Sequence, residues 1–317
     1  MSRRLVSLAA VALLGLTAGC TANQDGGRIE PPVAAAPSAP PQAAAPDTSC
    51  NPRASLRPGA GSMPAPGQMP AGSHMATIQK RGRLIIGTSQ DTLLFSSRNP
   101  FTGAIEGFDV DMGRQVAQAI FGDPDKIQIK VIGYDQRVDL AADGTVDLVA
   151  DTMTVNCTRL KQVDFSAIYY EAGQRVLVST DSSASGIQDL GGKRVCAVAG
   201  STSLDNIAKV GTKPVPVGRS GWADCLVAFQ QNEVDAISTD DTILAGLAAQ
   251  DPYAKVVGDK FTEEPYGMAI SKQHPEFTRF VNQVLERNKA DGTWKRTYEK
   301  WLHDFGRAPQ PPQASYR

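Results

Sequence analysis

The chain has only three histidines among its 317 residues, and His74, His274 and His303 are scattered along the sequence. Their spacing fits no pattern of metal ligands, and none of them accompanies a nucleophile as a catalytic triad requires. The sequence therefore predicts a protein that is not an enzyme and that uses no metal ion or other cofactor.

An excess of charge of either sign is also missing. The chain has 32 Lys and Arg residues against 33 Asp and Glu residues, which gives a net charge of −1 with neutral histidines. Proteins that bind nucleic acid through electrostatics carry a marked surplus of positive charge. We therefore expect no nucleic acid partner.

Long apolar runs are absent except near the N-terminus, where residues 5–16 form one apolar stretch after Arg3 and Arg4. This stretch is too short to span roughly 30 Å of hydrocarbon. Small residues precede Cys20, and the whole pattern is typical of a lipoprotein signal peptide over residues 1–20. Cys20 would then carry the lipid that anchors the mature protein to the outer face of the bacterial cytoplasmic membrane. Thr17 stands where such signals usually have Leu, so secretion without lipid is the alternative.

Residues 21–75 are rich in Pro and Ala and poor in large apolar side chains. Such a segment buries too little apolar surface to offset the entropy of ordering, so we expect a disordered, semi-rigid tether. We expect residues 309–317 to form a disordered tail. The intervening residues 76–308 are numerous enough for two lobes with separate cores.

The folded part alternates short apolar runs with amphipathic segments, first in a βαβαβ order and then in a second series of the same kind. This order predicts two α/β units with mostly parallel sheets and a cleft between them. We expect strands at residues 84–87, 127–132, 146–150, 194–198, 215–217 and 234–238, and helices at 109–121, 137–142, 203–208, 223–231, 275–288 and 293–305.

Four cysteines remain when Cys20 carries lipid, namely Cys50, Cys157, Cys196 and Cys225. An oxidising compartment normally pairs such an even set into disulfides. Three pairings are possible, and the spacing alone does not choose among them.

A series of short motifs resembles the polar amino-acid-binding proteins of ABC importers, which are extracellular solute-binding proteins of family 3. The motifs are Gly-Phe-Asp-Val-Asp-Met at 107–112, Gly-Thr-Val-Asp at 144–147, Val-Asp-Phe-Ser at 163–166, Tyr-Tyr at 169–170 and Gly-Ser-Thr-Ser at 200–203. The resemblance extends over residues 76–305. It implies a two-lobed, type II periplasmic-binding-protein fold, with each sheet flanked by helices and the lobes joined by two hinge strands.

In this family the first lobe contains both ends of the folded chain. The resemblance places the first lobe at residues 76–170 plus 266–308 and the second lobe at 171–265. The hinge crossings would lie near residues 169–173 and 263–267. Cys196 and Cys225 would both lie in the second lobe and pair there, which leaves Cys50 to join Cys157 of the first lobe.

The resemblance implies a function in transport. A monomeric, lipid-anchored protein would capture a free polar amino acid, expected to be glutamate or aspartate with asparagine and glutamine still open, and deliver it to an ABC permease. An amino-acid sensor that presents its ligand to a membrane signalling partner would use the same cleft. An enzyme on this fold, such as a dehydratase or a murein lyase, is a further alternative.

The family's ligand-binding residues map onto positions of this sequence. Arg159 matches the arginine that binds the α-carboxylate of the ligand, with Thr154 adding a hydroxyl and a backbone N–H. Asp240 matches the acid that holds the α-ammonium, and Asp241 is the alternative if the register shifts by one. Ser201 and Thr202 match donors of the second lobe that complete the carboxylate site.

Other matched positions bear on the ligand's side chain. Tyr134 falls where the family has an aromatic ring over the aliphatic part of the ligand. Asp151 and Thr152 stand where relatives have small residues, so the sequence departs from the pattern there. Arg98 resembles an arginine that reaches the side-chain carboxylate of acidic ligands, whereas Gln90 and Asp91 in the same loop leave amide ligands possible.

Overall fold

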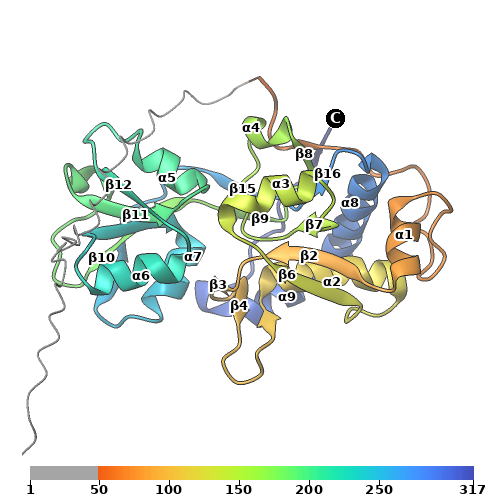
Figure 1. Cartoon of the computed structure of the whole chain (residues 1–317), viewed down its shortest axis with the longest axis horizontal. Coiled ribbons are helices and arrows are strands. Elements are labelled where there is room, and N and C mark those ends of the chain that lie inside the picture. Colours follow the sequence, from red (N-terminus) through yellow and green to blue (C-terminus); the bar gives the residue numbers. More distant parts are fainter. Residues whose placement is uncertain (1–48) are drawn as a thin grey trace, which may run out of the picture. The chain divides into compact units, whose positions relative to one another are not determined.

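Two five-stranded sheets form the centres of two lobes in the computed structural model of the protein, which describes residues 49–317 (Figure 1). The strand orders are β6-β2-β7-β16-β8 and β12-β11-β13-β10-β14. In each sheet a single strand, β16 or β10, runs antiparallel to its two neighbours. The predicted two-lobed fold with mostly parallel sheets is therefore confirmed. The strands of the first sheet are β2 (Leu84–Thr88), β6 (Ile127–Val131), β7 (Leu148–Val149), β8 (Val163–Phe165) and β16 (Ala269–Ser271).

Helices cover both faces of the first sheet because alternate strand residues point to opposite faces. Leu148 belongs to the core beneath α2, α8 and α9, whereas its neighbour Val149 belongs to a separate cluster beneath α3. The aromatic side chains of the last two helices, Trp294 and Tyr298 among them, lie in the larger core as their spacing indicates. The helices of this lobe are α1 (His74–Arg81), α2 (Phe108–Phe121), α3 (Arg137–Ala142), α4 (Cys157–Leu160), α8 (Pro275–Ala290) and α9 (Thr293–Trp301), with 3-10 turns at Tyr134–Gln136 and His303–Phe305.

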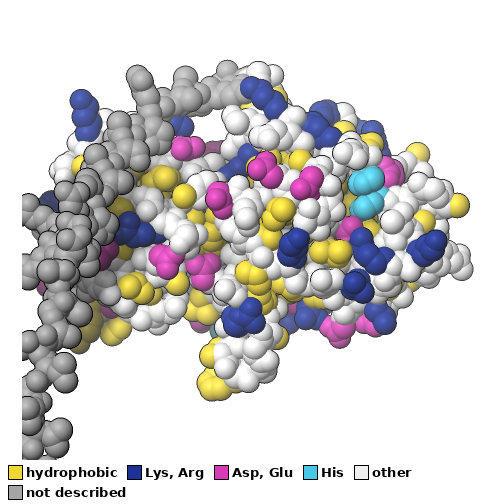
Figure 2. All heavy atoms as spheres, in the orientation of Figure 1, with side chains coloured by type: hydrophobic (Ala, Val, Ile, Leu, Met, Phe, Trp, Pro, Cys, Tyr) yellow, Lys and Arg dark blue, Asp and Glu magenta, His cyan; other side chains and the backbone are white. Residues whose placement is uncertain are grey.

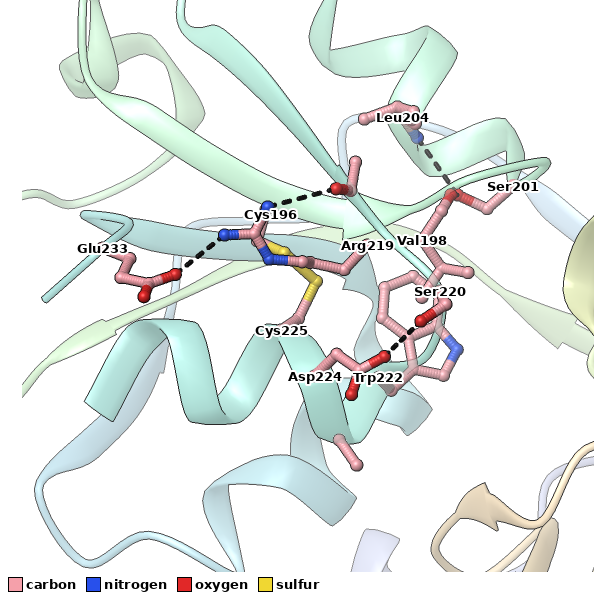
Figure 3. The surroundings of a disulfide bond; sticks show 12 residues. Cys196, Val198, Ser201, Leu204, Arg219, Ser220, Trp222, Asp224, Cys225 and Glu233 are labelled. Carbon is pink, nitrogen blue, oxygen red and sulfur yellow. Dashed lines mark hydrogen bonds and ion pairs between the residues drawn. A yellow bond between two sulfur atoms is a disulfide. The ribbon is translucent and has the colours of Figure 1, made fainter. Parts of the chain in front are cut away.

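The second lobe has its own core, in which Trp222 is almost completely buried. The predicted disulfide between Cys196 and Cys225 joins β11 to α6 across this core (Figure 3). The elements of this lobe are β10 (Gln174–Ser179), β11 (Arg194–Val198), β12 (Val215–Arg219), β13 (Ala236–Asp240), β14 (Ala254–Val257), α5 (Thr202–Ile207), α6 (Trp222–Gln230), α7 (Asp241–Ala248) and a 3-10 turn at Ile187–Leu190.

Two antiparallel strands connect the lobes. β9 (Tyr170–Ala172) pairs with β15 (Glu264–Tyr266), and each is followed directly by the antiparallel strand of the sheet that the chain enters. The first strand that the chain forms after each crossing, β10 or β16, is thus the antiparallel strand of its sheet. We retain the proposed division into residues 76–170 with 266–308 and residues 171–265.

The segments before and after the folded core are packed against it, which corrects part of the prediction. β1 (Ala54–Ser55) pairs in parallel with β17 (Ser315–Tyr316). The Ser55 hydroxyl donates to the carbonyl of Phe165 at 2.6 Å, and Arg317 donates to Asp164 at 3.1 Å. The predicted disorder is thus wrong for residues 49–75 and for the tail 309–317.

The physical reason is that composition averages over a segment, whereas ordering needs only a few well-placed contacts. A disulfide joins Cys50 to Cys157, and the side chain of Met69 is buried in the core of the first lobe. The predicted signal peptide, Cys20 and the first part of the proposed tether lie outside the described residues.

Basic and acidic side chains are interspersed on the face seen in Figure 2. A small antiparallel sheet is formed by β3 (Asp91–Thr92), β4 (Ser96–Arg98) and β5 (Ile105–Glu106). The hairpin of β4 and β5 projects from the first lobe, and its turn carries the exposed side chain of Phe101 (Figure 1). Within residues 49–317, no helix combines the length and the apolar character that crossing a membrane requires.

Candidate functional site

A cavity lies between the lobes, where the carboxyl ends of strands from both sheets meet. Ligands of open α/β sheets bind at such strand ends. Most of the lining residues have polar side chains, and they include one carboxyl group and two guanidinium groups. Its lining residues are Tyr134, Arg137, Thr152, Thr154, Arg159, Ser201, Thr202, Ser203, Trp222, Thr239, Asp240 and Ile243.

Arg159 reaches the cavity from the first lobe. It lies on the short helix α4, whose N-cap Asn156 accepts a hydrogen bond from the Arg159 backbone N–H at 2.9 Å. The guanidinium donates to the carbonyl of Thr154 at 2.6 Å and to that of Gly200, in the second lobe, at 3.1 Å. Burial, followed by the nearby charge of Arg137, lowers the pKa of Arg159 to about 9. No carboxylate oxygen within residues 49–317 lies within 4 Å of this guanidinium.

Asp240 faces the cavity from the second lobe, where it ends β13 and precedes α7. Its Oδ2 accepts a hydrogen bond from the hydroxyl of Tyr266 at 2.5 Å, whereas its Oδ1 is buried and has no hydrogen-bond partner among the described residues. Burial, with the charge of Glu264 as the next cause, raises the pKa of Asp240 well above its usual value. Its neighbour Asp241 instead pairs with Lys260 at 2.9 Å and does not line the cavity.

Glu264 connects the two lobes beneath the cavity. It lies on hinge strand β15 and is almost completely buried. One carboxylate oxygen accepts from the hydroxyl of Thr154 at 2.6 Å and from that of Thr202 at 2.8 Å, and the other accepts from Asn206 at 3.0 Å. The hydroxyls of Thr154 and Thr202, one from each lobe, are thus oriented by a single carboxylate.

Ser201 is the N-cap of α5. Its hydroxyl accepts from the backbone N–H of Leu204 at 3.2 Å and donates to the carbonyl of Val198 at 2.6 Å (Figure 3). Gly200 precedes it with φ +77°, and a Cβ there would lie 2.7 Å from the Cα of Asp135 in the first lobe. The turn that carries Ser201 and Thr202 therefore approaches the first lobe closely only because residue 200 is glycine.

Two aromatic rings, one from each lobe, pack against each other at the cavity wall. Tyr134 of the first lobe and Trp222 of the second pack edge to face with their centroids 5.8 Å apart. The guanidinium of Arg137 lies 5.0 Å from the centre of the Tyr134 ring and donates to the carbonyls of Tyr134, Asp151 and Gly200. These contacts give the cavity an aromatic wall next to its polar one.

Asp151 and Thr152 differ in position. Thr152 lines the cavity with φ +43°, and its backbone N–H donates to Asp109 at 2.6 Å. Asp151 lies behind the wall, where one carboxylate oxygen accepts from the backbone N–H of Ser89 at 3.0 Å. Burial raises the pKa of Asp151, and burial raises that of Asp109 to about 7.

Comparison with known proteins assigns this architecture to a family. A profile of the bacterial extracellular solute-binding proteins, family 3, matches residues 84–304. The chain belongs to this family. It is 36% identical over 231 residues to the ABC transporter glutamine-binding protein GlnH of Bacillus subtilis, which covers 73% of this chain and 85% of that protein. It is 32% identical over 237 residues to the glutamate-binding protein GluB of Corynebacterium efficiens, with 71% and 80% covered.

Solved structures agree with this assignment. An ancestral arginine-binding protein, bound to arginine in one structure and to glutamine in another, has a TM-score of 0.65 to this chain in both cases. The sequence identity is 32%, and the match covers 70% of this chain and 99% or 98% of those chains. As a family 3 solute-binding protein, this protein works outside the cytoplasm.

Two predicted positions of the solute-binding protein do not line its cavity, namely Asp151, which lies behind the wall, and Arg98. Arg98 is exposed on β4, where it donates to the side chain of Gln90 at 2.7 Å and to the carbonyl of Gly103 at 2.7 Å. It does not line the cavity, so the structure contradicts its predicted contact with a ligand carboxylate. The hairpin that carries Arg98 projects from the lobe, and the local hydrogen bonds fix the guanidinium to the hairpin itself.

Several residues of the site were not predicted. Arg137, Trp222, Thr239 and Ile243 line the cavity, and Glu264 orients two of its hydroxyls. Arg137 begins α3 directly after the 3-10 turn that contains Tyr134, and this local sequence does not indicate a binding role.

A larger hollow on the second lobe is lined by Arg194 and Tyr253 among others, but Arg194 is already paired there with Asp235. The cavity between the lobes therefore remains the candidate site.

Proposed function

We propose that this solute-binding protein captures a free polar amino acid in the cavity between its lobes and delivers it to an ABC importer. One observation carries the proposal. Among residues 49–317, a buried guanidinium without a carboxylate partner, on Arg159, and a buried carboxyl oxygen without a donor, on Asp240, line the same cavity from opposite lobes. These two groups complement the α-carboxylate and the α-ammonium of an amino acid.

Each of these buried charges is costly unless it meets an opposite charge. An amino acid supplies both opposite charges at once, and it does so only when both lobes contact it. The rings of Tyr134 and Trp222 supply apolar surface for the aliphatic part of the ligand, whereas the hydroxyl hydrogens of Thr154 and Thr202 are already donated to Glu264. Micromolar affinity requires about 8 kcal/mol. Charge-assisted contacts contribute about 1.5–3 kcal/mol each, so the two charged contacts act together with the apolar contacts to the aromatic rings.

We infer that the ligand's side chain is neutral, with glutamine as the preferred ligand. The expected preference for acidic ligands depended on Arg98, and this residue lies outside the cavity. Arg137 is the other guanidinium of the cavity wall, and it already donates to the carbonyls of Tyr134, Asp151 and Gly200. An acidic side chain would therefore add a carboxylate without a cationic partner of its own, whereas a relative that is 36% identical to this chain is a glutamine-binding protein.

Calorimetric titration with the twenty amino acids tests this function. We expect glutamine to bind with micromolar or tighter affinity and at least about tenfold more tightly than glutamate, because only glutamate leaves a carboxylate without a partner. Tighter binding of glutamate would reject the neutral side chain. The absence of binding by every amino acid would reject the proposed function. Copurification with a permease, as opposed to a signalling protein, would identify the importer as the partner.

Anchoring by lipid is a separate proposal that depends on Cys20, outside the described residues. We expect Cys20→Ala to move the protein from the membrane fraction to the soluble fraction, because the substitution removes the thiol that receives the lipid. Membrane fractionation and intact-mass spectrometry measure this result. An unmodified mass for Cys20 in the parent protein, together with unchanged fractionation, would show that export proceeds without lipid.

A further inference from the structure

The N-terminus of helix α6 has no cap within its own lobe. Its N-cap is Gly221, which has no side chain, and the backbone N–H groups of a first helical turn need acceptors from outside the helix. Asp91, a residue of the first lobe, provides one. Its Oδ2 accepts from the backbone N–H of Trp222 at 2.8 Å and from that of Ala223 at 3.2 Å. The carboxylate of one lobe therefore caps a helix of the other.

The second oxygen of Asp91 contacts Tyr134, a residue of the cavity wall. Asp91 Oδ1 accepts from the hydroxyl of Tyr134 at 3.0 Å, and the same hydroxyl lies 2.6 Å from that of Thr92. Tyr134 and Trp222 form the aromatic wall of the cavity, and Asp91 is bonded to both of them. The contact thus links the position of two ligand-facing rings to the contact between the lobes.

Residue 221 leaves space for this contact. A Cβ on Gly221 would lie 2.6 Å from Asp91 Oδ2, which is closer than a carbon and an oxygen can approach without displacement. The backbone of Gly221 has φ −147°, which any residue can adopt, so no local strain requires glycine there. Asp91 can approach this closely because residue 221 has no side chain.

We propose that Asp91 is an interlobe latch, a positioning residue that favours the closed cavity by capping α6 from the opposite lobe. A carboxylate at a helix N-terminus accepts hydrogen bonds from its free N–H groups and also interacts favourably with the helix dipole. Because Asp91 and α6 belong to different lobes, rotation at the hinge breaks this contact and exposes both partners to water. The latch rests on the proposed function only in that closure retains the amino acid.

Asp91→Ala in the full chain tests the latch, with glutamine as the ligand. We expect glutamine to dissociate about tenfold faster and its affinity to fall by the same factor, with little change in the association rate. Asp91→Asn should restore most of the affinity, because asparagine caps helices nearly as well as aspartate. Asp224→Ala is the matched control: this exposed carboxylate lies in the first turn of α6 but belongs to the same lobe (Figure 3), and its loss should leave the dissociation rate unchanged within about twofold.

Gly221→Ala provides a second test that keeps the carboxylate. We expect weaker glutamine binding in the parent chain but no further weakening in Asp91→Ala, since the added methyl group acts by displacing Asp91. Additive effects of the two substitutions, or an unchanged dissociation rate in Asp91→Ala, would overturn the latch while leaving the proposed function intact.

Distances between spin labels on the two lobes measure closure without reference to any ligand. Asp91→Ala should increase the open fraction relative to the parent protein, and equal distance distributions would overturn the latch. If no amino acid bound the parent protein, the proposed function would fail and this measurement would still decide on the latch.

Discussion

Replacing Arg159 with Ala, or Asp240 with Asn, should remove detectable amino-acid binding. Either change leaves one charged α-group of the ligand in the closed cavity without its partner, which costs about 3–5 kcal/mol, or roughly a thousandfold in affinity. The Asp240→Asn side chain keeps its size and still accepts a hydrogen bond from Tyr266, so the loss reports on charge. Isothermal calorimetry with glutamine at millimolar concentration measures the result.

Arg98→Ala is the matched control for these substitutions. It removes the same guanidinium from an exposed position outside the cavity, so the affinity for glutamine should stay within about twofold of the parent value. Circular dichroism and thermal unfolding should show that the Arg159 variant is folded, since its guanidinium also holds two backbone carbonyls. Retention of at least a tenth of the affinity in Arg159→Ala would show that the carboxylate site lies elsewhere.

The local pattern of apolar and polar residues was enough to predict many of the helices and strands. The helix predicted at residues 137–142 and the strand predicted at 194–198 coincide with α3 and β11, since each combines a periodic apolar pattern with clear boundaries. The strand predicted at 146–150 is longer than β7, which has ladder bonds only at Leu148–Val149. Apolar runs indicate burial, and burial continues beyond the last ladder bond.

The candidate site could be predicted where one motif fixes one position. Arg159 and Asp240 were predicted from the resemblance to the family's motifs, with Asp241 as the alternative to Asp240, and the structure brings Arg159 and Asp240 to the same cavity. Glu264 and Asp91 act between lobes, and no local pattern indicates which groups meet when two lobes close. The predicted ligand contact of Arg98 also depended on tertiary structure, because no local pattern indicates the direction in which a hairpin projects.

Removing the disulfide between Cys50 and Cys157 should produce the largest loss of stability among simple changes to this protein. Chain-entropy reasoning assigns the stabilisation to the loop closed in the unfolded state. The two cysteines are 107 positions apart in sequence, whereas Cys196 and Cys225 are 29 apart. These lengths correspond to about 4.8 and about 3.6 kcal/mol, respectively. Urea unfolding of the paired Cys→Ser variants, followed by tryptophan fluorescence, measures the difference.

Ligand binding should survive the loss of this disulfide, although Cys157 lies only two positions before Arg159. Helix α4 keeps its cap from Asn156, and the carbonyl of Thr154 still holds the Arg159 guanidinium, so the affinity for glutamine should change by less than about threefold. The paired strands β1 and β17 also keep the N-terminal segment in place. A larger stability loss from the Cys196–Cys225 pair would show that loop length does not determine the stabilisation. A loss of binding without Cys50–Cys157 would instead mean that the covalent link itself positions Arg159.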